Sequence, residues 1–252
     1  FRGRDDAASK QKKQAEMHGL KLNQLKLSDS VIRFIIQRYT REAGVRQLER
    51  TIAEIARKQV VKIMKKEELS ALNKKQVEEM LGKPLFSHGL KDTKNQVGVV
   101  NGLAYTPFGG DILPIEVTSF KGIGRLVITG QLGDVMKESA NIALGYIKAN
   151  AKKYDIDPKF FEENDIHIHV PEGAVPKDGP SAGISMASAI ISALTNTKTN
   201  VNVGMTGEIT LRGNVLPIGG LKEKSISAHR SGLTKIIVPK ENEKDLEDIP
   251  DE

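Results

Sequence analysis

The sequence contains no cysteine and no tryptophan. The absence of cysteine excludes disulfide bridges, thiolate metal sites and a cysteine nucleophile, and it is compatible with a reducing compartment. No apolar run approaches the roughly 18 residues that a membrane-spanning helix needs. The first residues, Phe-Arg-Gly-Arg-Asp-Asp, also lack the pattern of a secretory signal. We therefore expect a cytoplasmic protein that does not insert into a membrane.

The charge is unevenly distributed along the chain. Residues 1–80 carry 19 Lys and Arg against 11 Asp and Glu, whereas the remainder carries 19 against 21. A solvated basic helical surface is the simplest interpretation, and a surface that binds nucleic acid or another acidic partner is the alternative. Aromatic residues do not interleave with the basic ones, so nucleic acid remains a secondary prediction.

The first 82 residues are predicted to form a small all-α domain. Because the chain opens on Phe instead of Met, we expect a fragment or processed product, with residues 1–8 as tag or linker. Helix-capping residues at 28–30 precede an apolar helical face over 31–39. Apolar residues spaced by three and four predict a long helix over 45–63, and a short third helix starts at Asn73.

Residues 83–95 are predicted to be a connector, and residues 96–252 a mixed α/β domain. The change is visible in the appearance of short β-branched runs separated by Gly-rich turns. The predicted strands are 97–100, 112–117, 125–128, 166–170 and 235–238, the predicted helices 133–149, 181–194 and 221–231, and residues 203–216 are predicted to form a hairpin.

Ser181 is the first candidate for chemistry. It stands where a loop rich in Pro and Gly meets a predicted helix of small residues. It is either a plain helix N-cap or a nucleophile beside free backbone N–H groups that would stabilise an oxyanion. The surrounding residues 179–183 also match G-x-S-x-G, but the three prolines in the preceding ten residues exclude the buried strand that a nucleophile elbow requires.

A serine nucleophile needs a base, which can be a histidine or a buried lysine. Two histidines share one face of a predicted strand, but no third ligand stands at metal-site spacing, so we predict no metal. Nothing in the sequence brings any histidine to Ser181. The five histidines are His18, His88, His167, His169 and His229.

The lysine candidates are Lys222 and Lys224, which follow the pair Gly219-Gly220 at the start of a predicted helix. The helical face of Lys224 carries small and apolar neighbours, so its stem is the better candidate for burial, although Lys222 stays open. Desolvation would lower the pKa of either amine towards the range in which it acts as a base. The alternative is a solvated lysine pair at a helix start.

Three segments now resemble the peptidase motifs of the Lon proteases, in order and in spacing. They are Pro-Lys-Asp-Gly-Pro-Ser-Ala-Gly at 176–183, Met-Thr-Gly-Glu-Ile-Thr-Leu-Arg-Gly at 205–213 and Gly-Gly-Leu-Lys-Glu-Lys at 219–224. The stretch 39–50 resembles the small α-subdomain of the Lon AAA+ module. The resemblance implies a helical AAA+ lid subdomain followed by a mixed α/β Ser–Lys peptidase domain.

Carried over by position, the resemblance implies Ser181 as nucleophile and Lys224 as general base, a variant of triad logic. It implies that Thr206 lies near the lysine and orients it. Asp178 belongs to the loop that rearranges around the nucleophile, where it is either a gate that pairs with Lys224 or a cap of its own turn. Arg46 falls at the sensor arginine, which reaches nucleotide phosphates in the parent ring.

The implied function is ATP-dependent hydrolysis of unfolded or damaged proteins by a homohexamer in protein quality control and the stress response. Peptide hydrolysis itself would need no cofactor, whereas the full-length protein would use ATP with Mg. The rival interpretation is a non-catalytic regulatory or nucleic-acid-binding module. The sequence contains no G-x-x-x-x-G-K-[ST] phosphate loop. Compared with the family, we expect the large AAA+ subdomain and the N-terminal domain to lie outside this chain. Because the chain stops at Glu252, we expect the same of the final strand and helix of the peptidase domain.

We predict that this chain alone does not hydrolyse ATP, because it lacks the loop that cradles the phosphates. The measurement is phosphate release from ATP with Mg by purified chain. Release clearly above the rate without protein would contradict the prediction.

Overall fold

The computed structural model describes residues 2–40, 45–69, 72–85, 94–106, 109–171 and 176–249. His88 and most of the predicted connector at 83–95 lie outside these ranges. The chain divides into two compact units, Phe1–His88 and Gly89–Glu252. The first is helical and the second combines helices with a sheet. None of the described helices is long and apolar enough to cross a membrane.

The helical unit is shaped by its caps and by one apolar core. Ser28 accepts a hydrogen bond from the Val31 N–H at the start of α2, and Asn73 forms a reciprocal capping box with Gln76 at the start of α4. The first helix was not among the predictions, because residues 1–8 had been set aside as tag or linker. The elements are α1 (Arg2–Met17), η1 (Leu22–Leu25), α2 (Asp29–Tyr39), α3 (Arg46–Met64) and α4 (Lys74–Leu81).

The second unit is built on a six-stranded mixed sheet with the order β3-β4-β2-β1-β5-β8. The strands of the unit are β1 (Val99–Thr106), β2 (Gly109–Lys121), β3 (Leu126–Thr129), β4 (Asn164–His169), β5 (Val203–Met205), β6 (Glu208–Ile209), β7 (Val215–Leu216) and β8 (Lys235–Ile237). Its helices are α5 (Asp134–Ala149), η2 (Ala151–Tyr154), α6 (Phe160–Glu163), η3 (Pro180–Ala182), α7 (Gly183–Thr195), α8 (Leu221–Arg230) and η4 (Lys240–Asp248).

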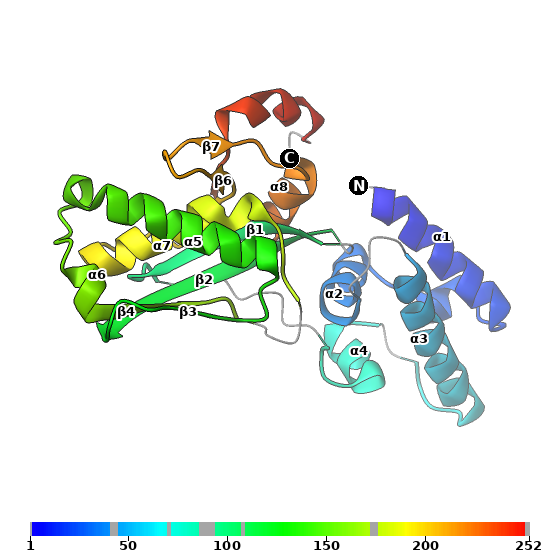
Figure 1. The fold of residues 1–252 in the computed structure, drawn as a ribbon. Coiled ribbons are helices and arrows are strands. Elements are labelled where there is room, and N and C mark those ends of the chain that lie inside the picture. Colours follow the sequence, from blue (N-terminus) through cyan, green and yellow to red (C-terminus); the bar gives the residue numbers. More distant parts are fainter. Residues whose placement is uncertain are drawn as a thin grey trace. The chain divides into compact units, whose positions relative to one another are not determined.

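Helices cover both faces of this sheet. On β2, Leu113 and Ile115 point into the main core, which α5 and α7 complete. The neighbouring Ile112 packs instead with Leu103 and with Ala228 of α8. Because successive side chains of a strand point to opposite faces, α8 lies on the face opposite α5 and α7. Figure 1 shows α5 and α7 side by side along one face of β1, β2, β3 and β4.

The predicted hairpin over 203–216 is only partly correct. Its first segment, β5, leaves the hairpin and joins the large sheet, parallel to both β1 and β8. The hairpin consists of β6 and β7, closed by hydrogen bonds between Thr210 and Asn214. A three-residue strand with a glycine at its centre carries too little periodicity to distinguish these pairings. The chain therefore leaves the sheet at Thr206 and Gly207, where the predicted site residues converge.

Candidate active site

Ser181 lies in the 3-10 turn η3, at the entrance of α7. The turn follows Gly179, whose φ of +115° favours glycine because it has no Cβ. The Ser181 backbone oxygen accepts hydrogen bonds from the Gly207 N–H at 2.8 Å and from Thr206 Oγ1 at 3.3 Å. The segment that carries the predicted nucleophile is thus tied to the chain leaving β5.

The start of α7 differs from the sequence-based prediction in two ways. The helix begins at Gly183, with Ala182 as N-cap, so Ser181 does not cap it. The N–H of Gly183 donates to Pro180, and the N–H of Ile184 donates to the β5–β6 connection. The prediction of free oxyanion donors is therefore wrong for these two amides, because the 3-10 turn and the neighbouring backbone already use them.

The Ser181 hydroxyl is not engaged in holding this turn. Its residue is half-buried, and within the described part of the chain no hydrogen bond involves its Oγ atom. A buried structural serine usually donates to a nearby carbonyl, as Ser185 does to Met205 one turn further along α7. The hydroxyl of Ser181 is thus available for chemistry.

Lys224 is a fully buried amine. Only 2 % of the residue is exposed, whereas Lys222, two positions earlier on α8, is exposed. The close approach of β2 contributes to this burial, since a Cβ at Gly110 would lie 2.0 Å from the Glu223 backbone oxygen. The structure therefore separates the two lysines that the sequence pattern left open, and it buries the one at which the family motif places the base.

Burial changes the acidity of this amine. Desolvation disfavours the charged form and lowers the pKa of Lys224 from 10.5 to about 8. At pH 7 roughly one amine in ten is then neutral, against fewer than about one in a thousand at the ordinary pKa. A neutral amine carries a lone pair that can accept a proton, so Lys224 has the property that a general base requires.

Thr206 connects the lysine to the serine turn. Lys224 Nζ donates to Thr206 Oγ1 at 3.1 Å, and the same hydroxyl donates to the Ser181 backbone oxygen. The Thr206 N–H is bonded to the Ile237 oxygen of β8, and the residue is only 1 % exposed. A neutral amine that spends one N–H on Thr206 keeps its lone pair for another partner. The threonine that resembled the orienting residue of the family is thus in contact with the buried amine.

Asp178 lies at the start of α5. Its Oδ1 atom accepts from the Met136 N–H at 2.9 Å and from the Gly179 N–H at 2.8 Å. The N-cap of α5 is Gly133, which has no side chain to satisfy the first amides, so Asp178 takes that role from a distant part of the chain. Within the described residues no ion pair joins it to Lys224.

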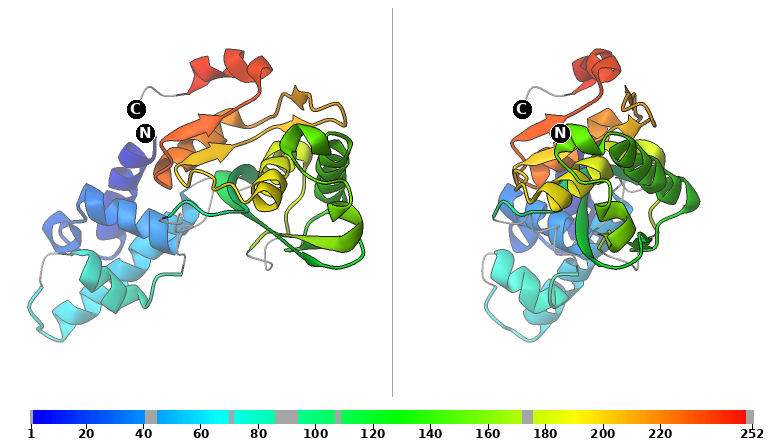
Figure 2. Two further views of the ribbon diagram at one scale, coloured as in Figure 1. Left: turned by 90° about the vertical axis from the view of Figure 1, so that its left-hand side faces the viewer. Right: turned by 60° about the vertical axis from the view of Figure 1, so that its left-hand side comes forward.

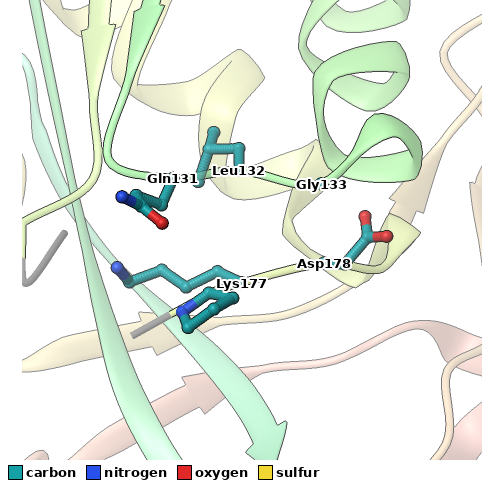
Figure 3. Close-up of a pocket in the computed structure, with 6 residues that line it drawn as sticks. Gln131, Leu132, Gly133, Lys177 and Asp178 are labelled. Carbon is teal, nitrogen blue, oxygen red and sulfur yellow. The ribbon is translucent and has the colours of Figure 1, made fainter. Parts of the chain in front are cut away.

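A surface hollow is lined by the same loop and by the residues that precede α5. Figure 3 shows the Asp178 carboxylate turned towards the first turn of α5, while Lys177 extends away from it and alongside Gln131. The backbone of Lys177 bonds to Gln131 and to Gly133, which fixes the loop four residues before Ser181. The lining residues are Gln131, Leu132, Gly133, Pro176, Lys177 and Asp178.

The other residues considered from the sequence lie on different elements of the chain. Arg46 is exposed at the first position of α3, in the helical unit. His229 is exposed in the last turn of α8, and His167 and His169 both bond to Thr129 on the sheet. Among the described residues no group of three or more His, Asp and Glu could hold a metal ion.

Two backbone contacts of the site were not predicted. The Gly207 N–H fixes the serine turn, and Gly133 lets Asp178 approach α5, since a Cβ there would lie 2.3 Å from the carboxylate carbon. Gly207 belongs to the motif at 205–213, but that motif does not indicate its backbone contact, and no motif includes Gly133.

Comparison with known protein families covers both units of the chain. Residues 71–252 match the Lon protease (S16) C-terminal proteolytic domain, and residues 16–75 match the Lon protease AAA+ ATPase lid domain. The chain belongs to the Lon protease family. The fold agrees with the predicted helical AAA+ lid followed by a mixed α/β peptidase domain.

Individual relatives support the same assignment. The chain is 59 % identical over 240 residues to Lon protease of Bacillus thuringiensis (strain Al Hakam) and 57 % identical over 240 residues to Lon protease 1 of Bacillus subtilis (strain 168). Each match covers 95 % of this chain, but only 30 % and 31 % of the two relatives. The chain thus spans less than a third of the length of these Lon proteases.

We predict that Thr206→Val lowers kcat/KM for a fluorogenic peptide by about 10- to 100-fold. Valine has nearly the shape of threonine but cannot accept from Lys224, and a misplaced base loses part of the 10²- to 10⁴-fold that such groups contribute. Thr206→Ser keeps the hydroxyl and is the matched control, which should retain most activity. Equal losses in both variants would refute the orienting role of the hydroxyl.

Proposed function

We propose that this chain hydrolyses peptide bonds with Ser181 as nucleophile and Lys224 as general base. The observation that carries the proposal is the buried Lys224 amine, whose pKa is lowered to about 8 and whose partner Thr206 also holds the serine turn. No metal or cofactor is needed for this chemistry, since the serine oxygen supplies the nucleophile and the lysine moves the proton.

The reaction proceeds in two steps, acylation of Ser181 and hydrolysis of the resulting ester. Ser181 Oγ attacks the scissile carbonyl carbon while its proton passes to the neutral Lys224 amine. As the C–N bond breaks, the leaving amine takes that proton and the acyl group remains on Ser181 as an ester. Water then attacks the ester carbonyl, gives a proton to Lys224, and the serine oxygen leaves and recovers it. The products are one free amine and one carboxylic acid.

In the parent protein, we propose, this activity is coupled to ATP with Mg and acts on unfolded or damaged polypeptides threaded through a homohexamer. The match of residues 16–75 to an AAA+ ATPase lid domain supports the coupling. Arg46 would there be the sensor arginine that reaches the nucleotide phosphates. The cytoplasmic location and the role in protein quality control stay predictions of the family resemblance.

We predict that Ser181→Ala and Lys224→Ala each abolish cleavage of a fluorogenic peptide, because each removes one half of a proton-transfer pair. Members of such a pair are not additive, so the double variant should be no worse than either single one. For the unaltered chain, kcat/KM should rise with pH through a midpoint near 8, since only the neutral amine accepts the serine proton.

His229→Ala is the control for this prediction and should retain most activity, because His229 is exposed at the far end of α8. Near-normal turnover by Lys224→Ala would refute the assignment of the base. A fluorophosphonate that labels the chain but not Ser181→Ala would exclude the rival, a non-catalytic regulatory or nucleic-acid-binding module, since only the peptidase forms the covalent adduct.

Asp178 is the proposed gate of this site, with a second position in which its carboxylate pairs with Lys224. Such a pair would favour the ammonium and raise the lysine pKa, so it would switch the base off. We predict that Asp178→Asn shifts the pH midpoint of kcat/KM to lower values, because the lysine loses its proton more easily without the carboxylate. If Asp178 only caps α5, the variant lowers the melting temperature and leaves the midpoint unchanged.

A further inference from the structure

The loop that leads into α8, the helix of Lys224, is held by hydrogen bonds to one side chain from another part of the chain. Asn242, in η4, accepts a hydrogen bond from the Ile218 N–H at 2.9 Å and donates to the Ile218 oxygen at 2.8 Å. Its amide nitrogen also donates to Asp245 at 2.6 Å. Asn242 is 2 % exposed, so these bonds are made out of water, where leaving them unmade costs most.

Ile218 stands directly before the turn that starts α8. The turn is Gly219-Gly220, and Gly220 has a φ of +69°. The Gly220 oxygen accepts from the Lys224 N–H at 3.0 Å, so the lysine lies in the first turn of the helix. Glycines add no stiffness of their own, and the first turn of a helix lacks intrahelical partners for its amides. The position of the amine therefore depends on what holds Ile218.

The backbone of Asn242 is also linked by hydrogen bonds to the segment that contacts Thr206. Asn242 donates its backbone N–H to the Pro239 oxygen, and Pro239 lies two residues after the end of β8. The last residue of β8, Ile237, accepts from the N–H of Thr206. Thr206 in turn accepts from Lys224. The hydrogen bonds thus close a frame from Thr206 through β8 and Asn242 back to the start of α8.

The arrangement of η4 and α8 in the ribbon views is consistent with these hydrogen bonds. In Figure 1 and in both parts of Figure 2, the red C-terminal segment η4 lies close to the orange helix α8, which it contacts. A Cβ at Gly207 would lie 3.5 Å from Pro239, so the start of this segment also abuts the chain that fixes Ser181.

We propose that Asn242 is a positioning residue that holds the loop entering α8, and with it the Lys224 amine, in its dry position beside Thr206. The effect on the amine stands on the hydrogen-bond frame alone, whereas its consequence for catalysis rests on the proposed function. A loop released from Asn242 would admit water to the first turn of α8, and hydration would return the lysine pKa towards its ordinary value.

Charged neighbours do not offer a competing cause. The elements packed against α8 are β1, β2 and η4. Their titratable groups are Tyr105 on β1, Asp111, Glu116 and Lys121 on β2, and the lysines and acidic residues of η4, while α8 itself carries Lys222, Glu223, His229 and Arg230. Burial is the cause of the lowered Lys224 pKa. A change in this pKa would therefore indicate a change in the exposure of the amine to water.

The experiment compares the unaltered chain with Asn242→Leu, which keeps the size of the side chain, and Asn242→Ala. Lysines are labelled with ¹³C at Cε, and the resonance missing from Lys224→Met is followed by NMR against pH. We expect the midpoint to rise from about 8 by about one unit, a roughly tenfold increase in proton affinity. Peptide cleavage should fall about tenfold at pH 7 and recover above the new midpoint.

The matched control is Asn164→Ala, which removes the hydrogen bond that the Asn164 side-chain amide donates to the Phe160 oxygen in α6, away from the site. It should lower the melting temperature without moving the Lys224 midpoint. An unchanged midpoint in folded Asn242→Leu overturns the proposal, even where activity falls. A shifted midpoint together with full cleavage by Lys224→Ala keeps the positioning role and refutes the proposed function, so the two failures are distinguishable.

Discussion

The hydrogen bond from Lys224 to Thr206 is made where water does not reach, and the remainder of the proteolytic site is arranged around that condition. Burying a charged amine without a paired anion is unfavourable, and this lowers the pKa of the amine. The neighbouring hydroxyls do not compete for it, since Ser225 bonds to Leu221 and Ser227 bonds to the Lys224 backbone. Thr206 is left as the polar partner of Nζ.

The sheet topology explains how the serine turn and the Lys224 amine both come to contact Thr206. The serine turn precedes α7 on one face of the sheet, whereas the lysine is carried by α8 on the other face. A continuous sheet would keep them apart. They approach only beyond the end of β5, where the chain turns out of the sheet through Thr206 and Gly207.

Local features of the fold could be predicted because the residues that determine them are adjacent in sequence. The capping side chains Ser28 and Asn73 act within three residues of their own positions, and the apolar stripe of α3 has a period that needs no tertiary information. The assignment of β5 failed for the opposite reason. Its pairing with β1 and β8 is decided by segments about 100 and 30 residues away along the chain.

The features of the site also fall into those that the sequence predicts and those that depend on distant segments. Ser181, Lys224 and Thr206 stand in recognisable motifs, and the family motif already favoured Lys224 over Lys222. The burial of Lys224 is a separate observation that the sequence pattern could not decide, and the approach of β2 at Gly110 contributes to it. The amides of α7 were misjudged because a 3-10 turn, and not the helix itself, carries the serine. Asn242 gave no signal at all, since one asparagine among acidic residues looks like an exposed surface in sequence.

A lysine base makes catalysis depend on packing to a degree that a histidine base does not. Histidine has an ordinary pKa of about 6.5 and is largely neutral at pH 7 without any help from the fold. Lysine must be lowered from 10.5 to about 8 by burial, so its proton affinity is a property of the whole surrounding frame. The described contacts of that frame lie between Gly110 and Asn242, all in the second unit. The lowered pKa of Lys224 therefore depends on the contacts in the second unit that keep this amine away from water.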